Sequence, residues 1–344
     1  MMLIDGSARS GSGTIVRCSM ALASLLGREI RIENIRAGRD RPGLRAQHLK
    51  VVQACRDMCK GVLKDASLGS RKLTYRPGER FRGGVYSWDI GTAGSTTMMA
   101  QTLLPMACFA DQPSRFRIEG GLFQDFAPSA YHMQFVLLPV LRLMGVNAEL
   151  DIIRPGYVPR GGGILELKVE PVAKLKALAL SGQGEILNIG GLALSSHLSG
   201  KRVSRRMAEE CRRVLRLQGY DATIQEIEDD TAPQEGAALA IYAETTTGSR
   251  IGFDRAGRPG RSSESIGRYV AQGFLEDVGT GAAVDRYTAD QLIMYAALAE
   301  GVTRYSVPRI TDHVDTNLWL VEEFLGARTR VDGSTLEIEG MGFN

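Results

Sequence analysis

The stretch that decides the fold class of this chain is Met2-Leu-Ile-Asp-Gly-Ser-Ala-Arg-Ser-Gly-Ser-Gly-Thr-Ile-Val-Arg-Cys-Ser-Met-Ala-Leu-Ala-Ser-Leu-Leu-Gly27. Met2 to Ile4 is typical of a short strand, and a Gly/Ser loop follows up to Gly13. Beyond it the apolar residues recur at helical spacing, and Gly27 supplies the stop signal. The stretch therefore predicts one strand-loop-helix unit, the building block of an α/β domain.

Similar units follow along the first 180 residues. Helices are predicted from Leu44 to about Leu63, from near Thr92 toward Pro105, and from about Ala130 to Met144. Strands are predicted between them, at 115–119 and 148–153. Three helices of similar length, each behind a Gly-containing turn, indicate an α/β fold of repeated βα units.

Residues 182–279 have the pattern of a separate, smaller α/β module inserted into the main domain (1–181 and 280–344). A strand at 185–194 leads to a strongly basic helix at 201–217, followed by further strands and a helix at 263–278. The Arg-rich stretch 255–261 is interpreted as a hairpin or linker tip. Helices are expected again at 290–298 and 318–325.

Composition sets the class of protein. The chain has 344 residues, of which 44% are apolar, and a net charge of +3, so any basic surface is local. Arginine dominates the 42 basic residues, which favours phosphate recognition but is equally typical of a GC-rich genome. The five cysteines form no CxxC pair, which indicates buried thiols. With no secretory signal and no bilayer-spanning apolar run, we expect a cytoplasmic protein with no membrane association.

Three Gly-rich or Arg-rich turns are candidates for holding phosphate. Ser7 to Gly13 opens onto a helix N-terminus, although a plain turn capped by Ser12 explains it equally well. Arginines crowd the Pro-Gly turn of Ile35 to Leu49, where an exposed basic loop is the ordinary alternative. Gly91 to Thr97 is a second such turn, with Gln101 within reach along the helix, and Gly161 to Gly163 permits close backbone approach or a simple hairpin.

His313 is the candidate nucleophile. It lies in Thr311-Asp-His-Val-Asp-Thr-Asn317, where Asp312 and Asp315 can orient the ring or favour its charged form. His132 and His197 have no comparable neighbours, and His48 falls on an apolar helix stripe and can equally be a core residue. A nucleophilic imidazole combined with anion-binding loops favours nucleotidyl transfer.

Taken together, these segments resemble the RNA 3′-terminal phosphate cyclase family. The matching stretches occur in the family's order and spacing over nearly the whole chain: Ile4–Ser7 with Gly11 and Gly13, Ile35–Arg39 with Pro42–Leu44 and Gln47–Leu49, Asp89–Ser95 with Gln101–Pro105, Gly161–Gly163, Ala289–Leu292, and His313 with Thr316–Asn317. The resemblance implies repeated βα units with four-stranded sheets and paired helices, carrying an inserted smaller α/β domain.

The resemblance also implies the chemistry. ATP, with Mg²⁺ or Mn²⁺, would adenylate His313, AMP would pass to an RNA 3′-phosphate end, and the neighbouring 2′-hydroxyl would close a 2′,3′-cyclic phosphate. By the same carry-over, two groups of residues would bind the reactants. The nucleotide would be held by Gln101, Tyr287, Asp290, Gln291, Arg36 and Arg39, and the RNA end by Arg41, Gln47 and His48. The oligomeric state is left open.

The first loop departs from the family pattern. Ser10 stands where the family has a metal-holding glutamate, Thr14 replaces a glutamine, and Arg9 replaces a glycine, so the metal ligands are unknown and metal affinity should fall. One hypothesis is that Arg9 supplies part of the missing charge neutralisation, while ATP phosphates and water hold the metal.

Alternatives remain open on the residues alone. They are a cyclase-like, non-catalytic RNA-binding or ribosome-assembly protein, and an unrelated enzyme that binds a phosphorylated metabolite. The role of the insert is also open: six basic residues can track an RNA backbone or form a solvated face, namely Lys201, Arg202, Arg205, Arg206, Arg212 and Arg213.

Overall fold

A computed structural model describes all residues from 1 to 344. Its main part contains three four-stranded sheets that share one strand arrangement. In each, the first two strands are parallel and the other two are antiparallel: the orders are β1-β2-β4-β3, β5-β6-β8-β7 and β9-β14-β16-β15. The predicted α/β fold of repeated βα units with four-stranded sheets is therefore confirmed, and the repeat is threefold.

The first unit follows the quoted N-terminal stretch. It consists of β1 (Met2–Asp5), α1 (Gly13–Leu26), β2 (Ile30–Glu33), α2 (Ala46–Cys59), β3 (Val62–Lys64) and β4 (Leu73–Arg76). Helix α1 begins where the Ser12 hydroxyl accepts from the Thr14 N–H, and it ends at Gly27 in the left-handed conformation. The prediction that α2 continues to Leu63 was wrong, because Lys60 is left-handed and ends the helix. Leu63 lies instead in the edge strand β3.

The second unit contains a helix with an interrupted hydrogen-bond pattern. Its elements are β5 (Gly84–Asp89), α3 (Thr96–Cys108), β6 (Ser114–Gly120), α4 (Ala130–His132), the π-helical turn Met133–Leu137, α5 (Leu138–Leu143), β7 (Asn147–Arg154) and β8 (Gly163–Glu170). Helix α3 begins at Thr96, capped by Ser95, and runs past Pro105. The segment expected to form a single helix contains the π turn because Pro139 has no N–H for the Phe135 carbonyl, which accepts from Arg250 instead.

The third unit is interrupted in the sequence by the strands and helices of a fourth sheet. It consists of β9 (Ala179–Leu180), α8 (Thr288–Gln291), α9 (Ile293–Leu298), β14 (Glu300–Ser306), α10 (Asp312–Leu325), β15 (Arg328–Asp332) and β16 (Thr335–Met341). Helix α10 begins well before the predicted Leu318, at Asp312, with Thr311 as its cap, so His313 lies in its first turn. None of the helices in the chain is long and apolar enough to cross a bilayer.

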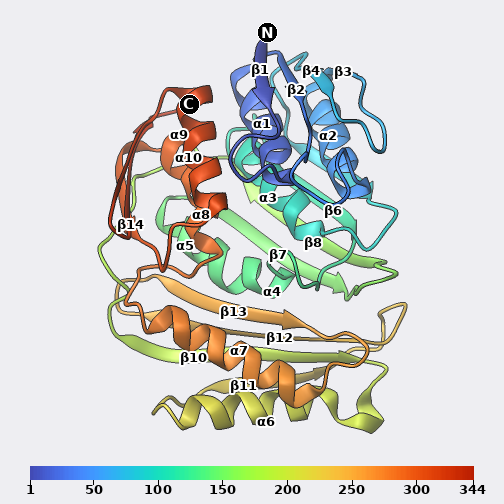
Figure 1. The fold of residues 1–344 in the computed structure, drawn as a ribbon, viewed down its shortest axis with the longest axis vertical. Helices are drawn as coiled ribbons and strands as arrows, with labels where there is room; N and C mark the ends of the chain where they lie inside the picture. Colours follow the sequence, from blue (N-terminus) through green and yellow to red (C-terminus); the bar gives the residue numbers. More distant parts are fainter.

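The fourth sheet, of order β11-β10-β12-β13, lies at one end of the molecule (Figure 1). Its elements are β10 (Ile186–Ser196), the 3-10 turn Ser199–Lys201, α6 (Val203–Arg216), β11 (Thr223–Glu228), β12 (Gly236–Thr245), β13 (Arg250–Ala256) and α7 (Ser263–Val278). Of the two alternatives for the stretch 255–261, the hairpin was wrong, since this stretch links the end of β13 to α7. The division into a main domain and an insert at 182–279 stays a prediction.

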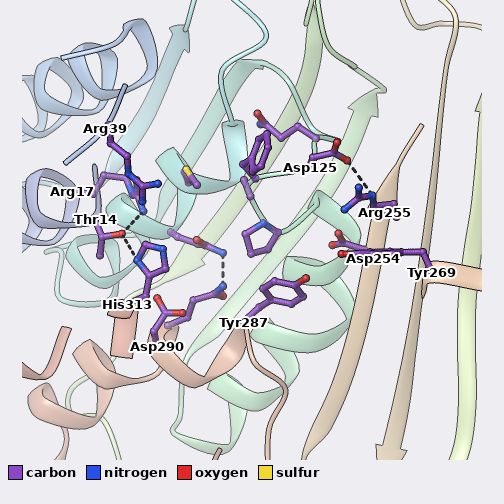
Figure 2. Close-up of a pocket in the computed structure, with 17 residues that line it drawn as sticks. Thr14, Arg17, Arg39, Asp125, Asp254, Arg255, Tyr269, Tyr287, Asp290 and His313 are labelled. Atoms are coloured by element: carbon purple, nitrogen blue, oxygen red, sulfur yellow. Dashed lines mark hydrogen bonds and ion pairs between the residues drawn. The ribbon is translucent and has the colours of Figure 1, made fainter. Parts of the chain in front are cut away.

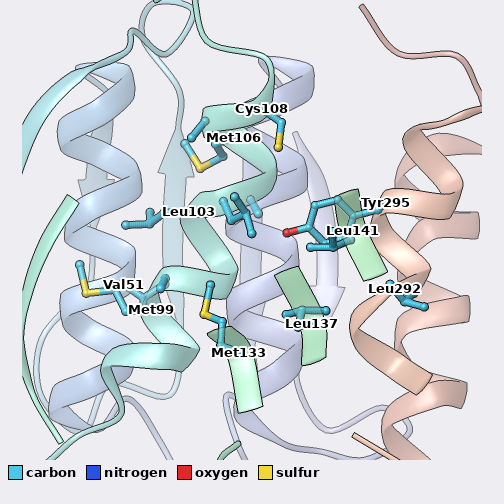
Figure 3. Close-up of a cluster of buried hydrophobic side chains, with 14 of the residues drawn as sticks. Val51, Met99, Leu103, Met106, Cys108, Met133, Leu137, Leu141, Leu292 and Tyr295 are labelled. Atoms are coloured by element: carbon cyan, nitrogen blue, oxygen red, sulfur yellow. The ribbon is translucent and has the colours of Figure 1, made fainter. Parts of the chain in front are cut away.

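Two apolar clusters form the interior. The larger fills the space between the three units, where side chains of α2, α3, α5 and α9 converge (Figure 3). The smaller packs α6 and α7 against one face of the fourth sheet. Because side chains alternate along a strand, the other face of that sheet, including Leu192, Ala238 and Ala240, belongs to the larger cluster. The fourth sheet is therefore packed on both faces.

Candidate active site

A cavity of about 310 Å³ lies where the three units meet the fourth sheet. Its walls come from segments far apart in the sequence: α1, α3, the loop before α4, the end of β13, α7, α8 and α10. Six of the predicted site residues have a place in this wall: His313, Gln101, Tyr287, Asp290, Gln291 and Arg39. Figure 2 shows His313, Asp290 and Arg39 on one side and the residues of the fourth sheet on the other.

The His313 ring is held by a residue from the other end of the chain. Its Nδ1 lies 3.2 Å from the Thr14 hydroxyl oxygen, which also accepts from Arg17 Nη2 at 3.1 Å. Burial, and then the positive charges of Arg17 and Arg39, lower the pKa of His313 below 6.5, with Asp312 opposing them. The ring is therefore unprotonated near neutral pH, which is the state that a nucleophile needs.

The acidic neighbours of His313 do not have the orienting role expected from the sequence. Asp315 forms an ion pair with Arg9 at 3.2 Å, and the Thr316 hydroxyl donates to the Ser10 hydroxyl at 2.9 Å. Asn317 Nδ2 donates to the Asp290 carboxylate at 3.2 Å. These contacts join the first loop and α8 to α10, and they fix the helix that carries His313.

The side-chain carboxyl group of Asp290 has a raised pKa. Burial raises the pKa of Asp290 to about 7, against the lowering effect of the Arg17 charge. Near neutral pH its carboxyl group is partly protonated and can donate a hydrogen bond to a ligand as well as accept one. Beside it, Gln101 Nε2 donates to Gln291 Oε1 at 3.1 Å, so α3 and α8 present linked amides to the cavity.

The backbone of Tyr287 is hydrogen-bonded to a buried ion pair between Asp285 and His132. Its backbone N–H donates to Asp285, whose other carboxylate oxygen lies 3.1 Å from His132 Nε2. Although burial alone would lower it, charge pairing and hydrogen bonding with Asp285 raise the pKa of His132. The expectation that His132 has no special neighbours was wrong, because Asp285 is 153 positions away along the chain and only folding brings it near.

Four predicted site residues lie outside the cavity wall. Three of them, Arg36, Arg41 and Gln47, lie in a loop or stabilise a turn. Arg36 donates to the backbone oxygens of Arg41 and Gly43, both at 2.8 Å, and shapes its own loop. Gln47 accepts from the Ser95 N–H at 3.0 Å and orders the turn before α3. Arg41 is exposed on the same loop as Arg36.

His48, the fourth, is buried, with 4% of its surface exposed, and burial lowers its pKa to about 3. It lies so close beneath α1 that a Cβ at Gly13 would be 2.1 Å from its Nε2. Of the two interpretations that the sequence left for His48, the structure supports the packed core residue.

The sequence reasoning missed several residues of the wall. Arg17 is the most important, and it is the single charged residue of the otherwise uncharged helix α1, a signal that the sequence itself contained. Four others face it across the cavity and belong to the loop before α4, to β13 or to α7: Asp125, Asp254, Arg255 and Tyr269. Arg255 begins the Arg-rich stretch that the sequence marks, but nothing in the local sequence distinguishes the other three, since only packing brings them to the cavity.

The first loop does not provide a metal site. Ser10, at the position of the family glutamate, bonds to the hydroxyls of Thr316 and Ser12, and Arg9 does not line the cavity. No group of three or more His, Cys, Asp or Glu side chains in the chain is arranged to hold a metal ion. The loop from Gly6 to Gly13 therefore supplies no acidic side chain for a divalent ion. Arg17 and Arg39 are the cations that the chain itself places in the cavity wall beside His313.

Comparison with known proteins decides the family. The sequence profile of the RNA 3′-terminal phosphate cyclase family matches residues 8–331. The chain belongs to this family. It is 37% identical to the RNA 3′-terminal phosphate cyclase of Pyrobaculum aerophilum, covering 99% of each chain. It is 36% identical to that of Pyrococcus furiosus (98% of this chain, 97% of the relative) and 38% identical to that of Hyperthermus butylicus (100% and 96%).

Proposed function

We propose that this chain is an ATP-dependent RNA 3′-terminal phosphate cyclase that works through an adenylate on His313. Membership of the family and the likeness to relatives named as such cyclases over their whole length support the activity. The observation that carries the proposal for this chain is the position of the His313 ring: its Nδ1 lies beside the Thr14 hydroxyl, and the ring lines a cavity whose wall also contains Arg17 and Arg39.

The first step is the attack of His313 Nε2 on the α-phosphorus of ATP, with pyrophosphate as the leaving group. For Nε2 to carry the free electron pair, Nδ1 must hold the proton and donate it to the Thr14 oxygen. Arg17 and Arg39 stabilise the negative charge that builds up on the phosphate oxygens. Asp290, Gln101 and Gln291 offer hydrogen bonds to the nucleotide, and Tyr287 offers an aromatic wall.

The second and third steps act on an RNA 3′-phosphate end. An oxygen of that phosphate attacks the adenylated histidine and takes the AMP, which restores the neutral ring. The 2′-hydroxyl of the last ribose then attacks the activated phosphorus, AMP leaves, and the 2′,3′-cyclic phosphate closes. DNA lacks that hydroxyl and cannot complete the last step.

The test is retention of a label from ATP carrying a radioactive α-phosphate. The wild-type protein should keep the label after denaturation, and His313→Ala should lose it entirely. His197→Ala is the control, because His197 is a histidine outside the cavity wall. Wild-type protein that stays unlabelled and leaves 3′-phosphorylated RNA unchanged would exclude the proposed function.

A further inference from the structure

A second groove, of about 430 Å³, lies beside the N-terminal ends of α6 and α7. Its charged wall residues are four cations and one acid: Lys201, Arg206, Arg258, Arg261 and Glu235. The groove also has apolar walls, among them Val158 and Pro259, which are largely exposed. Such a combination suits a ligand that carries both phosphates and flat apolar faces.

The groove adjoins the catalytic cavity through a single carboxylate. Asp125 lines the cavity and lies 3.3 Å from Arg255, which also lines it. The same carboxylate accepts from Arg261 at 2.8 Å and lies 3.8 Å from Arg258, and both of these arginines line the groove. The loop from β13 to α7 is therefore the wall that the two hollows share.

The free positive charge is concentrated in the groove and not along helix α6. Four arginines of α6 are each paired with a carboxylate: Arg205 with Glu209, Arg206 with Glu264, Arg212 with Glu226, and Arg213 with Glu210. Lys201 has no ion-pair partner, and Arg258 is 66% exposed at the edge of a carboxylate that two closer arginines share. The basic helix is thus mostly neutralised, whereas the groove contains Lys201, which is unpaired, and Arg258, whose ion pair with Asp125 is long and exposed.

We propose that this groove binds the single-stranded RNA on the 5′ side of the reacting end, with Lys201 and Arg258 contacting backbone phosphates. The inference rests on the proposed function, because it assigns the groove to a strand whose 3′-phosphate lies in the cavity and which leaves the cavity past the shared wall. An acidic protein segment would also find these cations, but the adjacency of the groove to the cavity favours the substrate itself.

The test measures the affinity of 3′-phosphorylated oligoribonucleotides by fluorescence anisotropy at several salt concentrations. A dinucleotide is compared with a dodecamer, and wild type with the double variant Lys201→Ala/Arg258→Ala. Each phosphate contact contributes about 0.7 to the slope of log affinity against log salt for a single strand, so the double variant should lose about 1.4 for the dodecamer. The dinucleotide should bind equally to both proteins.

The matched control is Arg216→Ala, which removes one charge at the opposite end of α6, where the guanidinium is 72% exposed and outside the groove. It should retain the wild-type slope. An unchanged slope in the double variant, or an equal fall in the control, would overturn the proposal and direct attention to a protein partner. Self-adenylation needs no RNA and is measured separately, so its failure in wild type refutes the proposed function and not the groove.

Discussion

The burial of His48 predicts how the stability of the protein depends on pH. Its imidazole is 4% exposed, and burial, assisted by nearby arginine charges, lowers its pKa from 6.5 to about 3. Because the folded pKa is below the unfolded one, the unfolded chain binds the extra proton as the pH falls. The contribution of His48 to the free energy of unfolding is therefore complete above pH 6.5 and declines as the pH falls toward 3. Between these two pKa values each step of one pH costs about 1.4 kcal/mol, so the loss is about 2 kcal/mol from pH 7 to pH 5 and about 4 kcal/mol by pH 3.

The assay compares urea unfolding of wild type and His48→Asn at pH 7 and pH 5. In the wild type, His48 Nδ1 accepts a hydrogen bond from the Arg45 N–H at 3.3 Å. Asparagine keeps an acceptor for this N–H and does not titrate. The wild type should lose about 2 kcal/mol more than the variant on acidification. Leu49→Ala, a neighbour without a titrating group, should retain the wild-type pH dependence. The same pH dependence in wild type and His48→Asn would refute the buried, neutral state and make His48 a candidate phosphate contact again.

Three further predictions concern the cavity and its supports. Thr14→Val keeps the side-chain size but removes the hydroxyl beside His313 Nδ1, so single-turnover adenylation should fall about 10- to 100-fold with little change in the KM for ATP. Gly13→Ala should lower the free energy of unfolding by about 1–3 kcal/mol in thermal denaturation, and by less in a His48→Ala background, because the new Cβ would be 2.1 Å from that ring. Asp125→Asn should lower the free energy of unfolding by about 1–3 kcal/mol at pH 7, because it removes a charged acceptor for Arg261. Hydrogen bonding from Arg261 lowers the Asp125 pKa below 3.8, so calorimetry should find the wild-type advantage above pH 3.8 and its loss as the pH falls through the lowered pKa.

The elements that the sequence predicted well are those fixed by residues a few positions apart. The Ser12 cap and the Gly27 stop define α1, and both act within one helical turn. The errors occurred where a local signal competed with a distant one. Helix α2 stopped at Cys59 because the residues of β3 that follow pair with β4, and the π turn before Pro139 depends on Arg250 from β13.

By itself the sequence determined the class of fold, the family and the identity of the candidate nucleophile, because strand and helix periods, caps and ordered motifs are written in neighbouring residues. Only the tertiary structure decided which side chains surround that nucleophile. Thr14 meets His313 across 299 positions, and Arg255 reaches the cavity because the fourth sheet packs against the three units. Such contacts depend on how whole elements bury their apolar faces, and no short stretch of sequence contains that information.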